Sequence, residues 1–514
     1  MRVRMCFDDL AWEQSENVSD AWISSLFKEE TLMAIGRFIL RHRKGTPVEL
    51  CDPKAGAFNA SFRMTFEDGG SALIRFPKPG ATMFPEEKSL GPFIIMEYID
   101  HAMSMSEALN TPGFAVEDRP ILNPRIDEEK LKMLYGQAAD ILLQLSTLSL
   151  PKIGSLSQID DFTWEVTRRP LSINMNELVR VGSLPRSKLP KPAATFGTAS
   201  AYFSALADLH LDHLIHQRND AVDSETDCRR KYTARTLFSQ LIAEGRLTTT
   251  PTNNGPFKLW CDDLRPSNIL VNENMQILGV VDWEFTYAAP VEFSHAPPCR
   301  NIGRRALREQ EDVALGRGTL KHNQRLSVPM KQSWENGGFW AVYAARKNFA
   351  FDTVFWKKLD ERYLGPRMSN DEDVWRERIE LLSKEDRETM DQVVQRKLDE
   401  MKDRILAWEA DEVVEPDASG HYGRDGSLIP AIEKMFWFLA LSGRTFNGLL
   451  DLSSDENFYK VELPKVDEMN PRSVSSSLHQ VEQHDIVVRY GGGMLSNREP
   501  LTSLGARVKL AVLT

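Results

Sequence analysis

The stretch that most constrains the fold is "KLWCDDLRPSNILVNENMQILGVVDWEFTYAAP", residues 258–290. Its two runs of branched apolar residues, 269–271 and 277–281, are separated by the polar turn Asn272-Glu273-Asn274. Branched apolar runs joined by a short polar turn predict a β-hairpin. The polar residues just before and just after these runs then lie at one end of the hairpin, because its entrance and its exit come together.

Three of these polar residues carry side-chain oxygens. Asp263 and Asn268 precede the hairpin and Asp282 follows it, so we expect them to converge. Carboxylate and amide oxygens on a short scaffold suit Mg²⁺ and the phosphates that it bridges. An aspartate, an asparagine five positions later and an aspartate after the next pair of strands also form the catalytic and metal-binding pattern of kinases. A surface hairpin with polar ends is the alternative interpretation.

The composition limits the partners and the setting of the chain. The 514 residues carry a net charge of −11, which argues against nucleic acid or an anionic membrane surface as the main partner. No run approaches the roughly 18 apolar residues that a membrane span needs. The five cysteines are scattered and form no C-x-x-C pair, so a reducing, cytoplasmic setting is the default expectation.

Periodicity elsewhere predicts an α+β architecture. Residues 48–99 contain short strands, while Asp127 begins a clear helix with apolar residues at helical spacing. The aromatic segment 339–359 is apolar nearly all round and predicts one buried helix. Further helical segments are expected at 11–44, 199–245 and 372–412, and the individual strands at 48–51, 60–66, 71–76 and 92–99.

The segment 372–412 has the pattern of a charged helix or helix pair, with an apolar stripe that includes Met390 and Val394. Such a stripe can form a dimer interface, but packing onto the same domain is the commoner outcome. The oligomeric state stays open at this point.

Several segments together resemble the aminoglycoside phosphotransferase family, and its fungal-type members in particular. They are "DLAWEQS", "FRMTFEDGGSALIRFPKPG", "GPFIIMEYID", "YAARKNFAFDTVFWKKL" and the hairpin stretch itself. The resemblance implies a two-lobed, protein-kinase-like fold that transfers the γ-phosphoryl group of ATP to a hydroxyl of a small-molecule acceptor. The acidic composition leans toward a cationic or polyhydroxylated acceptor.

The resemblance also assigns roles around the hairpin. Asp263 would accept or orient the proton of the acceptor hydroxyl, while Asn268 and Asp282 would hold Mg²⁺. Arg265 would either neutralise charge on the transferred phosphoryl group or brace the loop. Cys261 stands where the family usually has a histidine, and we interpret it as a packed thiol rather than a nucleophile.

In the small lobe the resemblance points to residues that bind ATP. Gly56 lies in "PKAGAFNASF", the turn that would cover the phosphates, although an ordinary hairpin turn is the alternative. Arg75 stands where kinases place a lysine on the third strand, and arginine can pair with phosphate. Met96, Glu97 and Tyr98 would form the hinge whose backbone groups hydrogen-bond adenine.

The resulting division of the chain has four parts. Residues 1–100 are the small lobe with an N-terminal helix, and residues 101–365 are the large lobe with the catalytic loop and the metal-binding hairpin. Residues 366–460 extend the large lobe with helices. Residues 461–514 form a tail of little periodicity that we expect to be poorly ordered.

The chain departs from the family between Arg75 and Phe93, where only residues 76–92 intervene. A kinase small lobe fits a helix of about 11–12 residues and a strand of about five to six there, and the helix supplies the Glu that pairs with the strand-three base. The small lobe is therefore expected to lack this helix, which leaves Glu86 and Glu87 as candidate partners. A small-molecule kinase, a pseudokinase that binds nucleotide or a partner without turnover, and a purely structural helical protein are the alternatives.

Overall fold

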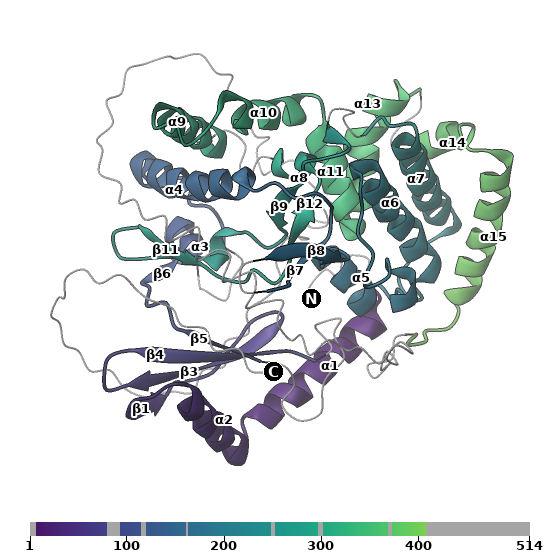
Figure 1. The fold of residues 1–514 in the computed structure, drawn as a ribbon. Coiled ribbons are helices and arrows are strands. Elements are labelled where there is room, and N and C mark those ends of the chain that lie inside the picture. Colours follow the sequence, from purple (N-terminus) through teal and green to yellow (C-terminus); the bar gives the residue numbers. More distant parts are fainter. Residues whose placement is uncertain are drawn as a thin grey trace.

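Two lobes of unequal size make up the described part of the chain. The computed structural model describes residues 7–79, 93–114, 120–160, 163–247, 252–296, 302–368 and 373–407. A small lobe built on an antiparallel sheet lies below a large lobe that is mostly helical (Figure 1). The active-site candidates of the sequence come from both lobes.

The small lobe is an antiparallel sheet. Its strands are β1 (Pro47–Leu50), β2 (Lys54–Ala55), β3 (Asn59–Phe66), β4 (Ser71–Pro77) and β5 (Ile94–Glu97), in the order β1-β3-β4-β5 with β2 beside β3. Side chains of β3 alternate between buried and half-buried positions along its whole length. This alternation shows that one face of the strand is buried, as the period-two pattern of the sequence requires. The four strand segments predicted from the sequence are confirmed.

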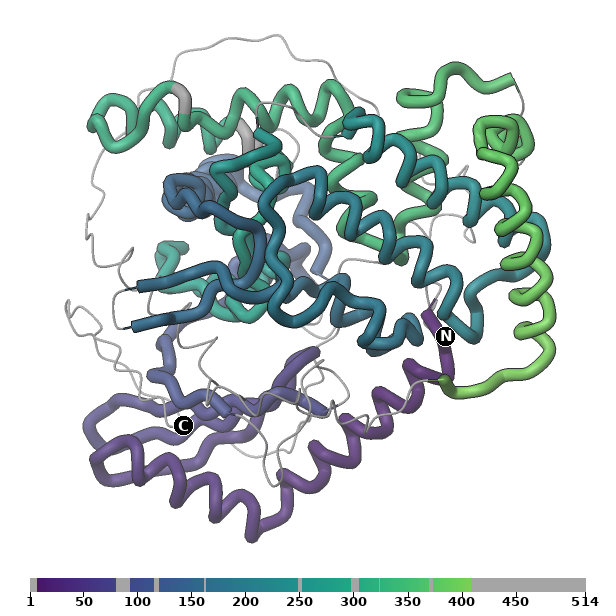
Figure 2. The backbone as a smooth tube through the Cα atoms, turned by 45° about the vertical axis from the view of Figure 1, so that its right-hand side comes forward, coloured from purple at the N-terminus to yellow at the C-terminus, as the bar shows by residue number. Residues whose placement is uncertain are grey.

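Two N-terminal helices, α1 (Asp9–Leu26) and α2 (Glu29–His42), complete the small lobe. Ile35 and Ile39 of α2 pack against the buried face of the sheet, together with Leu26 at the end of α1. The first turn of α1 is attached to the large lobe instead, because the carboxylate of Asp8 accepts hydrogen bonds from the Ser183 hydroxyl at 2.7 Å and from the backbone of Asn219 at 3.1 Å. Helix α1 therefore bridges the two lobes (Figure 2).

The large lobe combines small sheets with packed helices. Its strands are β6 (Met103–Ser104), β7 (Ser155–Gln158), β8 (Trp164–Arg168), β9 (Lys258–Cys261), β10 (Ile269–Val271), β11 (Ile277–Val280) and β12 (Thr286–Ala289). Its helices are α3 (Met105–Leu109), α4 (Glu128–Thr147), α5 (Ile173–Val181), α6 (Ala199–His216), α7 (Glu225–Ala243), α8 (Val291–Ser294), α9 (Ile302–Gly316), α10 (Ser327–Glu335), α11 (Gly338–Arg346), α12 (Phe351–Val354), α13 (Asp360–Leu364), α14 (Val374–Ile379) and α15 (Lys384–Glu400). The largest hydrophobic core joins α5, α6, α7 and α11.

Helix α4 begins where the sequence predicts it. The side chain of Asp127 accepts a hydrogen bond from the backbone N–H of Lys130 at 2.9 Å, which satisfies one of the unpaired donors of the first turn. Glu128 and Glu129 follow in that turn, where the positive end of the helix favours acidic side chains.

The prediction of one helix over 339–359 is wrong. Helix α11 ends at Arg346, and Lys347 leaves the helical conformation with φ −132° and ψ 79°. The backbone N–H of Asn348 donates to the side chain of Asn174 at 3.1 Å, a tertiary bond that replaces the next bond within the helix. A short 3-10 turn, α12 and a π-helical turn (Phe355–Leu359) follow. The chain is therefore bent at the residue that follows Arg346.

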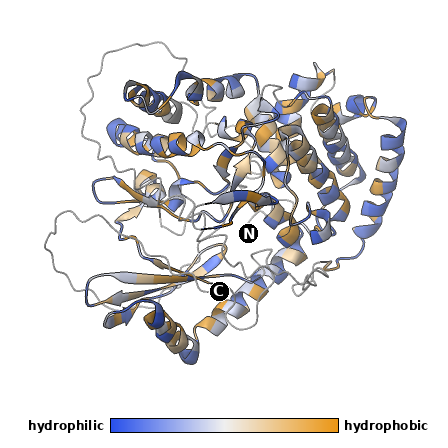
Figure 3. Cartoon of the chain, in the orientation of Figure 1, coloured by the Kyte–Doolittle hydropathy of each residue, from blue (hydrophilic) through white to orange (hydrophobic). Residues whose placement is uncertain are grey.

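The charged segment after 372 is a pair of helices, α14 and α15, and α15 ends at Glu400 rather than near 412. Met390, Val393 and Val394 of α15 are buried against α7, so the apolar stripe packs onto its own lobe. In Figure 3 most of α15 is coloured as hydrophilic, which fits a helix that buries one narrow stripe.

Some expectations of the sequence lie outside the described residues. They are the segment 80–92, in which a small-lobe helix is expected to be missing, the junction at 297–301 and everything after 407, including the tail 461–514. Among the helices that the structure describes, none is long and apolar enough to span a membrane.

Candidate active site

The predicted hairpin is confirmed, and it sits beside a second pair of strands. Strands β10 and β11 pair in register from Ile269 opposite Val280, and the backbone N–H of Val281 donates to the carbonyl of Asn268 at 2.9 Å. Strand β12 then returns antiparallel to β9, with Thr286 opposite Cys261. The loop 262–268 and the residues after the hairpin are thereby held at the same end of the two strand pairs.

Asp263 is held in place by the side chains of Asn268 and Arg265. The side-chain amide of Asn268 donates hydrogen bonds to the carboxylate of Asp263 and to its backbone carbonyl, both at 2.9 Å. Arg265 forms an ion pair with the other carboxylate oxygen at 3.1 Å. Asp263 is only 8% exposed, and this burial raises its pKa to about 6, with the negative charge of Asp282 acting in the same direction.

Asp282 forms an ion pair between the lobes. Its carboxylate contacts the guanidinium of Arg75, which reaches it from β4 of the small lobe. The backbone of Asp282 has φ +65°, a left-handed conformation that L residues seldom adopt and that marks functional sites in many proteins. Two positions on, burial and the charge of Asp282 raise the pKa of Glu284. Arg75 therefore faces an acidic site.

Asp262 is the residue that the sequence interpretation missed. Its carboxylate binds the guanidinium of Arg346 at 2.7 Å and the indole N–H of Trp260 at 2.8 Å. It also accepts a hydrogen bond from the backbone N–H of Ile173, the first residue of α5, at 3.2 Å. Asp262 thus anchors the loop to α5 and α11, and no local signal in the sequence indicates partners so far away.

Cys261 behaves as a packed thiol. Its side chain is buried, and this burial raises the pKa of the thiol far above its ordinary value. A thiol of this kind stays protonated at neutral pH and is a poor nucleophile. The structure agrees with the interpretation of Cys261 as a packed thiol rather than a nucleophile.

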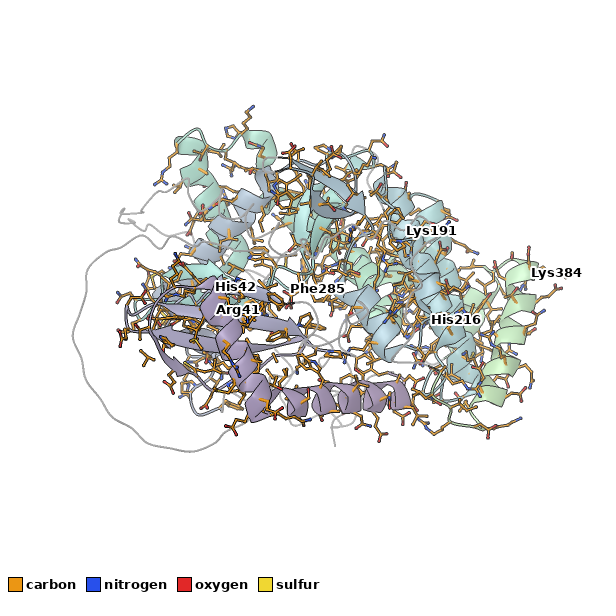
Figure 4. All side chains as sticks on the ribbon, turned by 60° about the horizontal axis from the view of Figure 1, so that its bottom comes forward. Arg41, His42, Lys191, His216, Phe285 and Lys384 are labelled. Carbon is orange, nitrogen blue, oxygen red and sulfur yellow. The ribbon has the colours of Figure 1, made fainter. Side chains whose placement is uncertain are left out.

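The turn that contains Gly56 belongs to the small lobe and lies two residues before a ring contact with the large lobe. The backbone N–H of Gly56 donates to the carbonyl of Asn59 at 2.8 Å, which closes the turn between β2 and β3. Two residues on, the ring of Phe58 meets the ring of Phe285 edge to face, with centroids 5.1 Å apart. Phe285 comes from the segment after Asp282, and Figure 4 shows it between the strands of the small lobe and the large lobe.

The predicted hinge residues are at the outer strand of the described sheet. Met96 and Glu97 belong to β5, which pairs with β4 through Leu73 and Ala72. The ring of Tyr98 is covered by the guanidinium of Arg63, 3.7 Å from the ring centroid. Strand β5 ends the described strand order, so its second backbone edge pairs with no other strand that the structure describes.

The structure brings five of the predicted residues into one site, namely Arg75, Asp263, Arg265, Asn268 and Asp282. Gly56 and Met96–Tyr98 lie in the small lobe and have no hydrogen bond or ion pair to this group among the described residues. Within the described ranges no three His, Cys, Asp or Glu side chains form a ready-made metal cage. Mg²⁺ does not require one, because it is usually bound by one or two carboxylates, waters and substrate phosphates.

The donor set therefore fits a magnesium ion. A carboxylate that already faces the Arg75 cation, beside a buried amide and a second carboxylate, offers hard oxygen ligands next to a cation that can bind phosphate. The same grouping of Asp, Asn and Asp on a loop and a hairpin is the one that kinases use.

Comparison with known proteins decides the family. A family model described as "Phosphotransferase enzyme family" (APH) matches residues 71–327, which is half of the chain. The chain belongs to the APH phosphotransferase family. The matched part runs from β4 through the loop 262–268 and the hairpin into α10, so it contains all five residues of the site. The α+β, two-lobed, kinase-like fold predicted from the sequence is confirmed.

Solved structures of phosphotransferases are similar to this APH chain. They include a macrolide 2'-phosphotransferase type I, at 11% identity over 62% of this chain and 96% of that one, with a TM-score of 0.31. Macrolide 2'-phosphotransferase MphH from Brachybacterium faecium matches at 14% identity over 60% and 90%, with a TM-score of 0.26. An aminoglycoside phosphotransferase from Alicyclobacillus acidocaldarius matches at 11% identity over 70% and 93%, with a TM-score of 0.16. No curated protein matches the chain.

Proposed function

We propose that this APH chain is a small-molecule kinase that transfers the γ-phosphoryl group of ATP to a hydroxyl of its acceptor. One observation carries the proposal. The buried carboxylate of Asp263, held by Asn268, lies within the electrostatic reach of Asp282, which the small lobe contacts through Arg75. An aspartate placed beside a metal-type site and a phosphate-binding cation is the arrangement that phosphoryl transfer needs.

Asp263 acts on the acceptor hydroxyl. As the bond between the hydroxyl oxygen and the γ-phosphorus forms, the bond from that phosphorus to the bridging oxygen breaks and ADP leaves. The hydroxyl proton passes to the Asp263 carboxylate, whose pKa of about 6 leaves it mostly ionised at neutral pH and yet basic enough to take a proton. The ion pair of Arg265 with Asp263 supports the bracing role for Arg265.

Asn268 and Asp282 would hold Mg²⁺, which would supply positive charge next to the β- and γ-phosphates, and Arg75 would bind the phosphates. Arg75 contributes a planar guanidinium that can bind two phosphate oxygens at once. The turn at Gly56 covers the phosphates, and backbone groups of Met96–Tyr98 bind adenine.

A catalytically impaired nucleotide-binding protein is the second candidate. Two observations favour it. Only residues 76–92 separate Arg75 from Phe93, which leaves little room for the usual helix and strand, and Arg75 contacts Asp282 itself. An ion pair between Arg75 and the metal ligand Asp282 can slow the assembly of a productive site. Correct positioning of the reacting groups supplies much of the rate of phosphoryl transfer.

The setting is proposed from the sequence and the thiols. Cys51, Cys228 and Cys261 are free, which supports a reducing, cytosolic compartment. The net charge of −11 supports a small-molecule acceptor rather than nucleic acid or a membrane surface as the partner.

Binding and turnover test the two candidates separately. ATP is titrated with and without Mg²⁺ into the wild-type chain and into Asp282→Asn, with Asp399→Asn on exposed α15 as the matched control. We expect Mg²⁺-dependent binding that Asp282→Asn weakens at least about 10-fold and that the control leaves unchanged. ADP release is then followed in Asp263→Asn, where loss of the base lowers turnover by about 10²–10⁴-fold.

Each result has a defined meaning. ATP binding that ignores both Mg²⁺ and Asp282→Asn refutes the metal assignment. Mg²⁺-dependent ATP binding, together with a wild-type turnover no higher than that of Asp263→Asn, selects the impaired nucleotide-binding protein.

A further inference from the structure

Lys347 occupies a defined place beside the catalytic loop. It is the residue at which α11 ends, and the residues on both sides of it are tied down. Arg346 binds the carboxylate of Asp262 at 2.7 Å, while the side chain of Asn348 accepts a hydrogen bond from the amide of Asn174 on α5 at 2.7 Å. The bend in the aromatic segment thus places a lysine between the catalytic loop and α5.

The acidic groups around Lys347 already have cationic partners. Its charge interacts with Asp262, Glu177 and Asp263, but none of these carboxylates lies close enough to form an ion pair with it. Asp262 is bound by Arg346 at 2.7 Å, Glu177 by an arginine of α5 at 2.9 Å, and Asp263 by Arg265 at 3.1 Å.

The ammonium group of Lys347 makes no hydrogen bond or ion pair with any residue in the parts of the chain that the structure describes. The side chain is half-buried. Burial, with the neighbouring charge of Arg346, lowers the pKa of Lys347, so an anion beside it would stabilise the charged form. A half-buried cation without a protein partner, close to the catalytic carboxylate, is suited to an anionic ligand.

The charged groups that act most on Lys347 are Arg346, Asp262, Glu177 and Asp263, and the metal-side residue Asp282 is not among them. The metal side is defined by Asp282, which contacts Arg75 of the small lobe. The neighbours of Lys347 are instead α5 and the first residues of the catalytic loop, and its own chain belongs to the helical part of the large lobe. We expect the acceptor to approach Asp263 from the side of Lys347, because the nucleotide and its metal would occupy the side of Asp282 and Arg75.

We propose that Lys347 binds an anionic group of the acceptor, so that the substrate of this kinase is a hydroxylated acid such as a sugar acid, a hydroxycarboxylate or a sugar phosphate. This inference rests on the proposed kinase function and adds the substrate class to it. It runs against the cationic acceptor suggested by the net charge of −11, because the charge of a whole chain says little about one pocket. Lys347 is a specificity residue that touches the acceptor away from the reacting hydroxyl.

The test compares acceptors that differ in a single anionic group. Gluconate and glucose, glycerate and glycerol, and glucose 6-phosphate and glucose form such pairs. Binding is measured by calorimetry and phosphoryl transfer by ADP release, in the wild-type chain and in Lys347→Met and Lys347→Arg. Lys384→Met is the matched control, because Lys384 lies far out on α15 with its side chain 89% exposed (Figure 4).

We expect the wild-type chain to bind the anionic member of at least one pair at least about 10-fold more tightly than the neutral member. Lys347→Met should weaken that binding about 10- to 100-fold and raise KM more than it lowers kcat, as expected when a charged hydrogen bond to the ground state is lost. Lys347→Arg should keep most of the preference. The affinity for MgATP should be the same in all variants.

Other outcomes overturn the inference. A wild-type chain that binds MgATP but prefers the neutral member of every pair refutes it and leaves the kinase proposal standing. A loss in Lys347→Met that is equal for both members of a pair also refutes it, because the ammonium would then act on the transferred phosphoryl group. Charge-selective acceptor binding that depends on Lys347, in a chain without Mg²⁺-dependent ATP binding, supports the inference and contradicts the kinase proposal alone.

Discussion

Replacement of Asp263 by asparagine should stabilise the protein while it removes activity. The carboxylate is 8% exposed, and its burial raises the pKa from an ordinary value of 3.8 to about 6. A raised pKa means that the folded chain holds the ionised form at a cost in free energy. Asparagine has almost the same shape, and its side-chain oxygen can still accept the hydrogen bond that Asn268 now donates at 2.9 Å.

The size and the sign of the effect follow from the two pKa values. Below pH 3.8 the carboxyl group is protonated in both states, so it makes no difference to stability. Between about pH 4 and 6 the unfolded chain loses this proton while the folded chain keeps it, and stability falls by about 1.4 kcal/mol per pH unit. Above pH 6 the cost levels off at about 3 kcal/mol, since both states are ionised. The pKa of about 6 already includes the favourable charge of Arg265, so the expected gain in Asp263→Asn is this whole cost of about 3 kcal/mol.

The assay is the difference in Tm between Asp263→Asn and the wild-type chain at pH 4, 5, 6, 7 and 8. We expect no difference at pH 4 and a Tm that is higher by a few degrees for the variant from pH 7 upward, with most of the change between pH 4 and 6. Asp399→Asn, on the exposed side of α15, should change the Tm little. Two results refute the view that the folded protein keeps this carboxylate ionised at a cost in free energy. They are an Asp263→Asn chain that is no more stable than wild type at pH 8 and a difference in Tm that does not change with pH.

Three further predictions concern the site and its supports. The rate of phosphoryl transfer should rise with pH through a midpoint of about 6 as Asp263 ionises. Asn268→Ala should move this midpoint to higher pH, because the amide no longer stabilises the carboxylate. A pH–rate profile with the same midpoint in both chains contradicts this prediction. Arg75→Met should tighten the binding of Mn²⁺ in the absence of nucleotide several-fold, because the cation that competes for Asp282 is gone. Electron paramagnetic resonance measures this binding, and equal Mn²⁺ affinities of the variant and the wild-type chain contradict the competition. Asp8→Ala should lower the free energy of unfolding by about 2–4 kcal/mol, because the hydrogen bonds from Ser183 and Asn219 to the Asp8 carboxylate are lost. Limited proteolysis should then cleave the chain first in α1, and an unchanged cleavage pattern shows that other contacts hold α1.

Local signals in the sequence account for the parts that were predicted well. The hairpin was predictable because branched apolar runs and the turn Asn272–Asn274 act over a few residues; in the structure the side chain of Asn272 accepts from the backbone N–H groups of Asn274 and Gln276, both at 2.9 Å. The start of α4 was predictable for the same reason, since Asp127 caps it from the adjacent position. The convergence of Asp263, Asn268 and Asp282 follows from the hairpin alone.

Partners distant in the sequence explain the parts that were not predicted. The aromatic segment after 338 has the composition of a continuous helix, and it is broken by bonds between Asn348 and Asn174, which are 174 residues apart. No periodicity within the segment indicates such a bond. Asp262 likewise has its partner 84 residues away in Arg346. The pairing of Arg75 with Asp282 was not foreseen from either residue, because the family pattern gives each a different partner.

The bridge made by α1 restricts how the lobes can move. The chain connects the lobes after β5, where the backbone N–H of Ala102 donates to the carbonyl of Val271 at 2.9 Å. Helix α1 connects them a second time, because Asp8 binds the large lobe and Leu26 packs in the core of the small lobe. Two separate attachments favour a rotation of the small lobe about the line that joins them over a free twist about the hinge. Such a rotation would disturb the ion pair of Arg75 with Asp282 and the ring contact of Phe58 with Phe285.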